Sequence, residues 1–172
     1  MTNTQNRPIL SFELNKKYSS FLEYLFDKDE NGVILLTNGN PVGKMINSLW
    51  ETSPYPVNQK FDNEIKVYLP IYPGSNYRMK YNFIYIDKWK TEQLRIFIES
   101  YFEIVIREFF VNGYEKHYQK KTIIEMILSD LNRYEYFFTY DQISKFDYRN
   151  RVKIVENIRF DIKKSRKSLI VR

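Results

Sequence analysis

The stretch from Leu94 to Val111 constrains the fold of this chain more than any other part of the sequence. Its apolar residues recur at helical spacing, but they lie on more than one side of the predicted helix. They are Leu94, Phe97, Ile98, Tyr101 and Val105, and also Phe102, Ile106, Phe109 and Phe110. A helix that is apolar on most sides has to be covered by other elements. We therefore expect a central helix here, which Gly113 ends or loosens.

Alternation of apolar and polar residues before about Asp87 predicts short strands. The segments are 10–14, with Leu10, Phe12 and Leu14 on one face, then 33–37, 65–69 and 77–86. The last two are separated by a turn rich in proline and glycine, so we expect them to form a hairpin. Residues 53–56 are predicted to be a loop.

Helical spacing predicts two helices in the first half, at about 16–27 and 42–50. After the central helix, Thr122-Ile-Ile-Glu125 and Thr139-Tyr-Asp-Gln142 each fit a capping box, which predicts that helices begin there. Phe138 and Ile143 are placed as the hydrophobic staple of the second. The helices expected are 122–131, about 140–145, and a basic helix capped by Asp147 that runs to about Ser165.

These elements predict an α+β fold, with a small, mainly antiparallel sheet from the first half packed on the long central helix. A helical C-terminal segment follows. We divide the chain into an α+β core at 1–115 and a basic helical segment at 116–172, with one continuous domain as the alternative. Hydrophobic residues make up 43% of the 172 residues, which is enough for a core and argues against disorder.

Composition excludes several classes of function. The chain has no cysteine, so disulfides, thiolate catalysis and Cys-based zinc sites are absent. His117 is the one histidine, so no histidine cluster can hold a transition metal. The chain has no run of about 18 apolar residues, so we expect no segment that spans a bilayer. The polar start, 1–8, lacks the apolar stretch of a signal peptide. We expect no cofactor, no membrane partner and an intracellular site of synthesis.

The net charge of +6 is unevenly distributed. Residues 145–172 carry ten basic and three acidic side chains, a net of +7, and the rest of the chain carries −1. Three successive helices ending in this segment resemble a helix-turn-helix, whose third helix would read DNA. The candidate contacts with DNA or with an acidic partner are Arg149, Asn150, Arg151, Lys153, Arg159, Lys163, Lys164, Arg166 and Lys167. A basic helix end favoured by its own dipole is the alternative.

Asp27-Lys-Asp29-Glu-Asn31-Gly32 matches the opening of a calcium loop. Such a loop closes with a bidentate glutamate at its twelfth position, where this chain has Asn38. Asn-Gly is also ordinary turn chemistry before a strand, and a plain turn is the favoured interpretation.

Gly39-Asn-Pro-Val-Gly43-Lys44 lies between a strand and a helix, as a phosphate-binding loop does. The motif needs four residues between its glycines and a hydroxyl after the lysine. Here three residues separate the glycines and Met45 follows, so the magnesium ligand is missing.

No catalytic set is supported by spacing. His117 lies in a polar segment near a predicted helix end, and no serine or carboxylate pair accompanies it at a meaningful distance. We therefore predict no catalytic residue, no metal ligand and a protein that is not an enzyme.

Two segments carry a resemblance: Ile106-Arg-Glu-Phe-Phe-Val-Asn-Gly-Tyr114 and Asp141-Gln-Ile-Ser-Lys-Phe-Asp-Tyr-Arg-Asn-Arg151. They look like parts of small proteins from tailed phages of Bacteroidetes, the crAss-like group. The chain also lacks alanine and is rich in Asn, Lys, Ile and Tyr, which is similar to that group. The resemblance implies a phage gene product, either a virion component such as a ring between portal and tail, or a DNA-binding regulator. It transfers no functional residues.

The expectation from the sequence is a structural assembly protein of a tailed-phage particle, at a head–tail connector or neck ring. It would contact other copies of itself and neighbouring virion proteins, and would reside in the virion after assembly in the host cytoplasm. The alternative is a cytoplasmic helix-turn-helix DNA-binding protein that uses the basic C-terminal helix.

Overall fold

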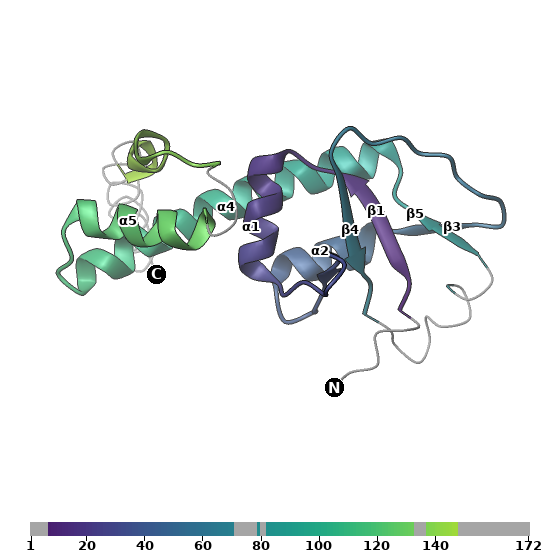
Figure 1. The fold of residues 1–172 in the computed structure, drawn as a ribbon, viewed down its shortest axis with the longest axis horizontal. Helices are drawn as coiled ribbons and strands as arrows, with labels where there is room; N and C mark the ends of the chain where they lie inside the picture. The colour runs from purple at the N-terminus through teal and green to yellow at the C-terminus, as the bar shows by residue number, and fades with distance from the viewer. Residues whose placement is uncertain (1–6, 71–78, 80–81, 133–136, 148–172) are drawn as a thin grey trace, which may run out of the picture. The chain divides into compact units, whose positions relative to one another are not determined.

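The structure is a computed structural model, and it describes residues 7–70, 79, 82–132 and 137–147 (Figure 1). The chain forms two compact units, one up to Phe102 and one from Glu103. The division lies inside the long helix α4 (Lys88–Glu115), so this helix contributes residues to both units.

A three-stranded sheet organises the first unit. Its order is β1 (Ile9–Glu13), β4 (Glu64–Tyr68) and β2 (Ile34–Leu35). β1 is antiparallel to β4, while β2 is parallel to it. Figure 1 shows β1 and β4 side by side. The strands predicted at 10–14, 33–37 and 65–69 are confirmed, the second as only two residues.

The predicted hairpin is wrong. β5 (Phe83–Tyr85) pairs antiparallel with β3 (Glu51–Ser53), a strand that the sequence did not predict and that ends at the first residue of the predicted loop 53–56. A strand has only two edges, and β1 and β2 occupy both edges of β4. β5 therefore has no edge of β4 to pair with, although the chain brings the two close in sequence.

Two capped helices belong to the first unit. Asn15 caps α1 (Lys16–Leu25) by accepting a hydrogen bond from the Lys17 amide at 3.1 Å. Asn40 caps α2 (Pro41–Leu49) in the same way, with Val42 as the donor at 2.8 Å. Asparagine is a preferred cap because its side-chain oxygen satisfies an amide left free by the first turn. Both predicted helices are confirmed.

The core of the first unit joins the sheet to these helices. Leu10 and Phe12 on β1 are fully buried. On α1, the Phe21 ring meets Phe102 of α4 edge to face, with ring centroids 5.1 Å apart. Aromatic pairs prefer this geometry, so this contact contributes to fixing α4 against α1.

Helix α4 begins at the change of pattern predicted at Asp87. The Asp87 carboxylate accepts a hydrogen bond from the Lys90 amide at 2.6 Å and caps the first turn. The expected role of Gly113 is corrected. It lies inside the helix, buried against Ile123, and a Cβ on it would come within 2.6 Å of that side chain. Gly113 therefore permits close packing.

The second unit continues from α4 into α5 (Lys120–Leu131) and a helical turn at 140–147. The Thr122 capping box is wrong, because α5 begins at Lys120 and Thr122 lies within it. The Thr139 box is confirmed. Gln142 N donates to Thr139 Oγ1 at 3.4 Å, and Thr139 N donates to Gln142 Oε1 at 3.2 Å. The staple residues Phe138 and Ile143 are both buried.

The fold class is α+β, with small, mostly antiparallel sheets, a long central helix and helices toward the C-terminus, as predicted. Across the described ranges, no helix is both long and apolar enough to cross a membrane.

Candidate functional site

The predicted basic contacts lie outside the described residues. This applies to Arg149, Asn150, Arg151, Lys153, Arg159, Lys163, Lys164, Arg166 and Lys167, and to the predicted helix that would carry them. Asp147, its expected cap, is described and lies inside the helical segment 140–147, so the break predicted at 146–147 is wrong. Its side chain is nearly buried and forms an ion pair with Lys120 of α5 at 3.1 Å.

The two described helices of the proposed helix-turn-helix are joined through Asn132. Its side-chain oxygen accepts hydrogen bonds from the amides of Phe137 and Phe138, at 3.1 and 3.0 Å. Its side-chain nitrogen donates to the Phe138 carbonyl at 2.7 Å. One amide side chain therefore ties the end of α5 to the start of the next helical turn.

The Asp27–Gly32 loop is built around Asp29. One of its carboxylate oxygens accepts from the amides of Asn31 and Val33, and the other accepts from the Tyr68 hydroxyl at 3.0 Å. Partial burial acts to raise the pKa of Asp29, but the hydrogen bonds outweigh it and the pKa is lowered. Gly32 adopts a φ of 77°, which suits glycine in a turn. Turn chemistry accounts for this geometry.

Of the two glycines in the phosphate-loop-like segment, Gly43 has a packing role. Gly43 is buried inside α2, and a Cβ added there would lie 2.0 Å from the Thr37 carbonyl oxygen. Lys44 is exposed, and its amide makes an ordinary helical hydrogen bond to Asn40. Gly43 is therefore explained by the close approach of α2 to Thr37.

His117 ends α4 in the left-handed conformation, with a φ of 60°. Its amide donates to the Tyr114 carbonyl, and the Tyr118 amide donates to the Gly113 carbonyl. This is the Schellman arrangement, which satisfies carbonyls at a helix C-terminus. The predicted helix-terminal position of His117 is confirmed.

A polar network that the sequence did not predict centres on Glu51. One carboxylate oxygen accepts a hydrogen bond from the Tyr85 hydroxyl at 2.8 Å, and the other is bound by the Lys90 ammonium. Lys90 first, and then Tyr85, lower the pKa of Glu51. The same contacts raise the pKa of Tyr85 and of Lys90. The partners lie 34 and 39 residues from Glu51, so no local pattern reveals them.

A pocket of about 390 Å³ adjoins this network and is lined by Asn47, Ser48, Trp50, Glu51 and Thr52. Both oxygens of Glu51 already bind protein donors, and its lowered pKa keeps it ionised at neutral pH. A general base works best with a pKa near the working pH. The arrangement therefore favours a structural link between β3, β5 and α4 over acid–base catalysis.

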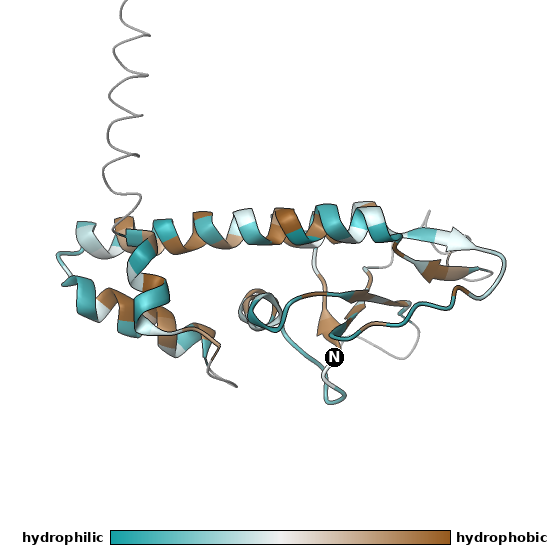
Figure 2. Ribbon diagram, turned by 90° about the horizontal axis from the view of Figure 1, so that it is seen from above, coloured by the Kyte–Doolittle hydropathy of each residue, from teal (hydrophilic) through white to brown (hydrophobic). Residues whose placement is uncertain are grey.

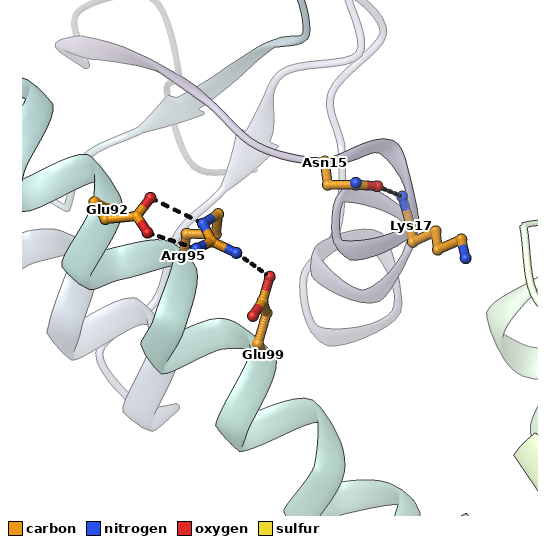
Figure 3. A network of polar contacts seen from close by, with 5 residues as sticks. All are labelled: Asn15, Lys17, Glu92, Arg95 and Glu99. Carbon is orange, nitrogen blue, oxygen red and sulfur yellow. Dashed lines mark hydrogen bonds and ion pairs between the residues drawn. The ribbon is translucent and has the colours of Figure 1, made fainter. Parts of the chain in front are cut away.

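A second charged cluster lies on the first turns of α4 (Figure 3). Arg95 is held between Glu92 and Glu99, with its guanidinium nitrogen 2.6 Å from a Glu99 oxygen. Its contact with Glu92, and then that with Glu99, raise the pKa of Arg95. These are exposed helix-surface pairs, which contribute little to stability.

Helix α4 carries several large apolar side chains that are exposed. Leu94, Ile98 and Phe102 are buried, whereas Trp89 is 70% exposed and Ile96 is 53% exposed. Farther along the helix, Ile104 is 48% and Val111 47% exposed. Figure 2 shows hydrophobic residues recurring along the whole helix. The sequence predicted that other elements cover α4 on several sides, but the described residues leave these side chains about half exposed or more.

Within the second unit, these side chains border a pocket of about 490 Å³. It is lined by Ile104, Arg107, Glu108, Val111 and Asn112, which all lie on α4. Among the described residues, no group of three or more His, Asp or Glu side chains is placed to hold a metal ion.

Comparison of the chain with protein-family models, with curated proteins and with solved structures finds no match.

Proposed function

We propose that this protein is a non-enzymatic assembly component of a tailed-phage particle, at a head–tail connector or neck ring. It acts through contacts with other copies of itself and with neighbouring virion proteins. The observation that carries the proposal is the exposure of large apolar side chains, above all Trp89 at 70% and Tyr55 at 76%.

Trp and Tyr are the residues most enriched at the energetic centres of protein interfaces. Each presents a large apolar surface with a polar atom that can still find a partner. Phe83, at 50% exposure, adds a third ring. Phe83 pairs with Ser53 in the β3–β5 sheet, and Tyr55 follows Ser53 by two residues. Both aromatic residues therefore come from the same end of this sheet. Exposed apolar surface of this kind marks interaction sites.

The basic segment fits the same function. Residues 145–172 carry a net charge of +7. In a particle this segment would meet an acidic neighbouring subunit or packaged DNA, since both offer dense negative charge.

The direct test is mass spectrometry of purified particles of the phage that encodes the chain. The protein should be present in stoichiometric amounts, and deletion of its gene should leave heads and tails unjoined. Complementation with Trp89→Ser or Tyr55→Ser should reduce incorporation at least tenfold. Glu30→Ser, which changes an exposed turn residue, should not. Absence of the protein from intact particles would refute the proposal.

A second candidate function is DNA binding through a helix-turn-helix. The ordered link from α5 through Asn132 to the confirmed Thr139 capping box favours it, because it supplies the first two helices of that motif. The basic residues of the predicted third helix would then contact base edges and phosphates.

Fluorescence anisotropy of a labelled duplex at two salt concentrations tests this candidate. Binding that falls steeply with salt is expected if phosphates are contacted. The full-length triple variant Arg149→Glu, Arg151→Glu, Lys153→Glu should then lose binding. Its matched control, Lys16→Glu, Lys17→Glu, Lys44→Glu, changes the net charge equally and should retain most of it. No binding near physiological salt removes this candidate.

A further inference from the structure

Three Asn-Gly pairs occur in the chain: Asn31-Gly32, Asn38-Gly39 and Asn112-Gly113. Asparagine is one of the thermolabile residues. A glycine after it removes the main protection, because glycine has no Cβ and its backbone nitrogen can approach the asparagine side chain without hindrance. The three pairs share this chemistry, so the fold decides which of them reacts.

The reaction converts asparagine to aspartate or isoaspartate. The glycine nitrogen gives up its proton to water and attacks Cγ of the asparagine, so a bond forms between this nitrogen and Cγ. The bond from Cγ to Nδ2 breaks, and Nδ2 takes a proton from water and leaves as ammonia. Water then opens either carbonyl of the resulting cyclic imide. The net change is the uptake of one water and the release of one ammonia, with no oxidant or cofactor.

Attack is slowed when the glycine N–H is held in a hydrogen bond. That bond has to break before the nitrogen can lose its proton and turn toward Cγ. The state of each glycine N–H in the fold therefore separates protected pairs from reactive ones.

The pair Asn112-Gly113 is protected by helix α4. Both residues lie inside this helix, where the amide of an interior residue donates to the carbonyl four residues earlier. Gly113 is also buried against Ile123. The helix would have to open before the Gly113 nitrogen could attack.

The pair Asn31-Gly32 is protected by a tight turn. The Gly32 amide donates to the Asp29 carbonyl at 3.0 Å. The Asn31 amide donates to the Asp29 carboxylate at 3.0 Å, and the Asn31 side-chain nitrogen donates to the same carboxylate at 3.4 Å. Asp29 thus holds both the attacking nitrogen and the group that it would attack.

The pair Asn38-Gly39 has neither form of protection. Gly39 is exposed in the turn before α2, and its amide donates to no other residue that the structure describes. The nearest atom to a Cβ built on Gly39 would be Oγ1 of Thr37, at 4.0 Å, so the space beside this backbone is open. We propose that Asn38 is a site of spontaneous deamidation, in which the Gly39 nitrogen displaces the side-chain amide.

The products act on the start of α2. Asn40 caps this helix, and the Thr37 carbonyl lies close against its Gly43. Aspartate at position 38 adds a negative charge near the helix N-terminus, which the helix dipole favours. Isoaspartate instead carries the backbone through its side chain and inserts an extra carbon between Thr37 and Asn40. Since both of these residues contact α2, isoaspartate disturbs the cap and aspartate does not.

Peptide mapping by mass spectrometry tests the site. Full-length protein is kept at mildly alkaline pH, and the mass gain from amide to acid is followed at the three pairs. Asn38 should convert about tenfold faster than Asn31 or Asn112, the factor expected when one hydrogen bond fewer has to break. Conversion should accelerate as pH rises, because the attacking nitrogen must lose its proton. In urea that unfolds the chain, the three rates should become similar, since only the fold distinguishes the pairs.

Gly39→Ala is the diagnostic variant. A methyl group at this position hinders the attack, so conversion of Asn38 should slow about tenfold. The 4.0 Å of space keeps the fold intact, which circular dichroism checks. Lys44→Ala, a change of an exposed residue in the same segment, should leave the rate as it is. Equal native rates at Asn38 and Asn31, or a Gly39→Ala variant that converts as fast as wild type, would overturn the proposal.

Thermal unfolding of the separated products tests the effect on α2. The isoaspartate form should unfold about 2–4 °C below the unaged protein, the shift expected when one helix cap is lost. Asn38→Asp should not lower the unfolding temperature. An isoaspartate form as stable as the unaged protein would overturn the assigned effect on the cap.

Discussion

His117 holds a backbone conformation that glycine adopts more easily. A side chain in the left-handed region costs about 1–2 kcal/mol, because Cβ approaches the following carbonyl oxygen. His117→Gly keeps both hydrogen bonds of the helix end and removes this strain. It should raise the free energy of unfolding by about 1 kcal/mol in urea titration. Glu115→Gly, two residues earlier inside α4, should lower it by about 1 kcal/mol. Equal effects at both positions would contradict the strain argument.

Gly43 is required by packing, and the sequence alone suggested a different reason for it. A methyl group at this position would meet the Thr37 carbonyl oxygen at 2.0 Å, a contact that only a backbone shift relieves. Gly43→Ala should therefore destabilise the protein by about 3 kcal/mol, the upper range for overpacking. Gly39→Ala, whose Cβ would have 4.0 Å of space, should change stability by less than about 0.5 kcal/mol. Thermal and urea unfolding of the two variants measure this difference.

Glu51 makes stability depend on pH in the acid range. A carboxyl whose pKa is lower in the folded protein stabilises the fold above its unfolded pKa of about 4.5, and this stabilisation is lost as pH falls through the lowered value. Glu51→Gln should therefore be less stable than wild type at neutral pH and lose less stability between about pH 5 and pH 3. Lys90→Met should flatten the dependence of stability on pH in the same way, since Lys90 is the main cause of the lowered pKa of Glu51. A Glu51→Gln profile parallel to wild type would show that the network does not act this way.

At the scale of elements, two segments that fit the same capping-box pattern behave differently. Thr139 and Gln142 exchange hydrogen bonds at a helix start, whereas Thr122 lies within α5. Thr139→Ala should therefore cost about 1 kcal/mol, the usual value for a lost cap. Thr122→Ala should be neutral or slightly stabilising, because alanine is the better helix former. Chemical denaturation distinguishes the two, and a larger loss at Thr122 would contradict the assignment of the helix start.

The same comparison shows how far the sequence predicts the elements. The strands of the first sheet and most helices follow from periodicity, and the start of α4 follows from the change of pattern at Asp87. The caps Asn15 and Asn40 act locally but were not predicted. The pairing of β5 with β3 does not follow, because a three-residue strand has too little alternation to be recognised and its partner is about 30 residues away. The Glu51 network is hidden for the same reason. The packing roles of Gly43 and Gly113 require a neighbour that only the folded chain supplies.

At the scale of the whole molecule, the apolar stretch 94–111 is the main support for the proposed function. Residues 94–111 are apolar on more sides than the described core covers, so several of their side chains stay exposed. The basic segment at 145–172 is the second large-scale feature, and it lies almost wholly outside the described residues. The candidate site is thus predictable as a surplus of apolar surface, while the apolar side chains that stay exposed are known only from the packing of the folded chain.

If the folded protein associates with other copies of itself, as the proposed function requires, stability should depend on protein concentration. Association of the folded form shifts unfolding by mass action, so a tenfold rise in concentration adds about 0.7 kcal/mol per chain to a fully dimeric protein. For a chain of this length, this raises Tm by about 2 °C. Scanning calorimetry over a hundredfold range of concentration measures the slope. Trp89→Ser should reduce it, while Glu30→Ser should keep it. A flat wild-type profile would mean that the folded protein does not associate with itself over this range.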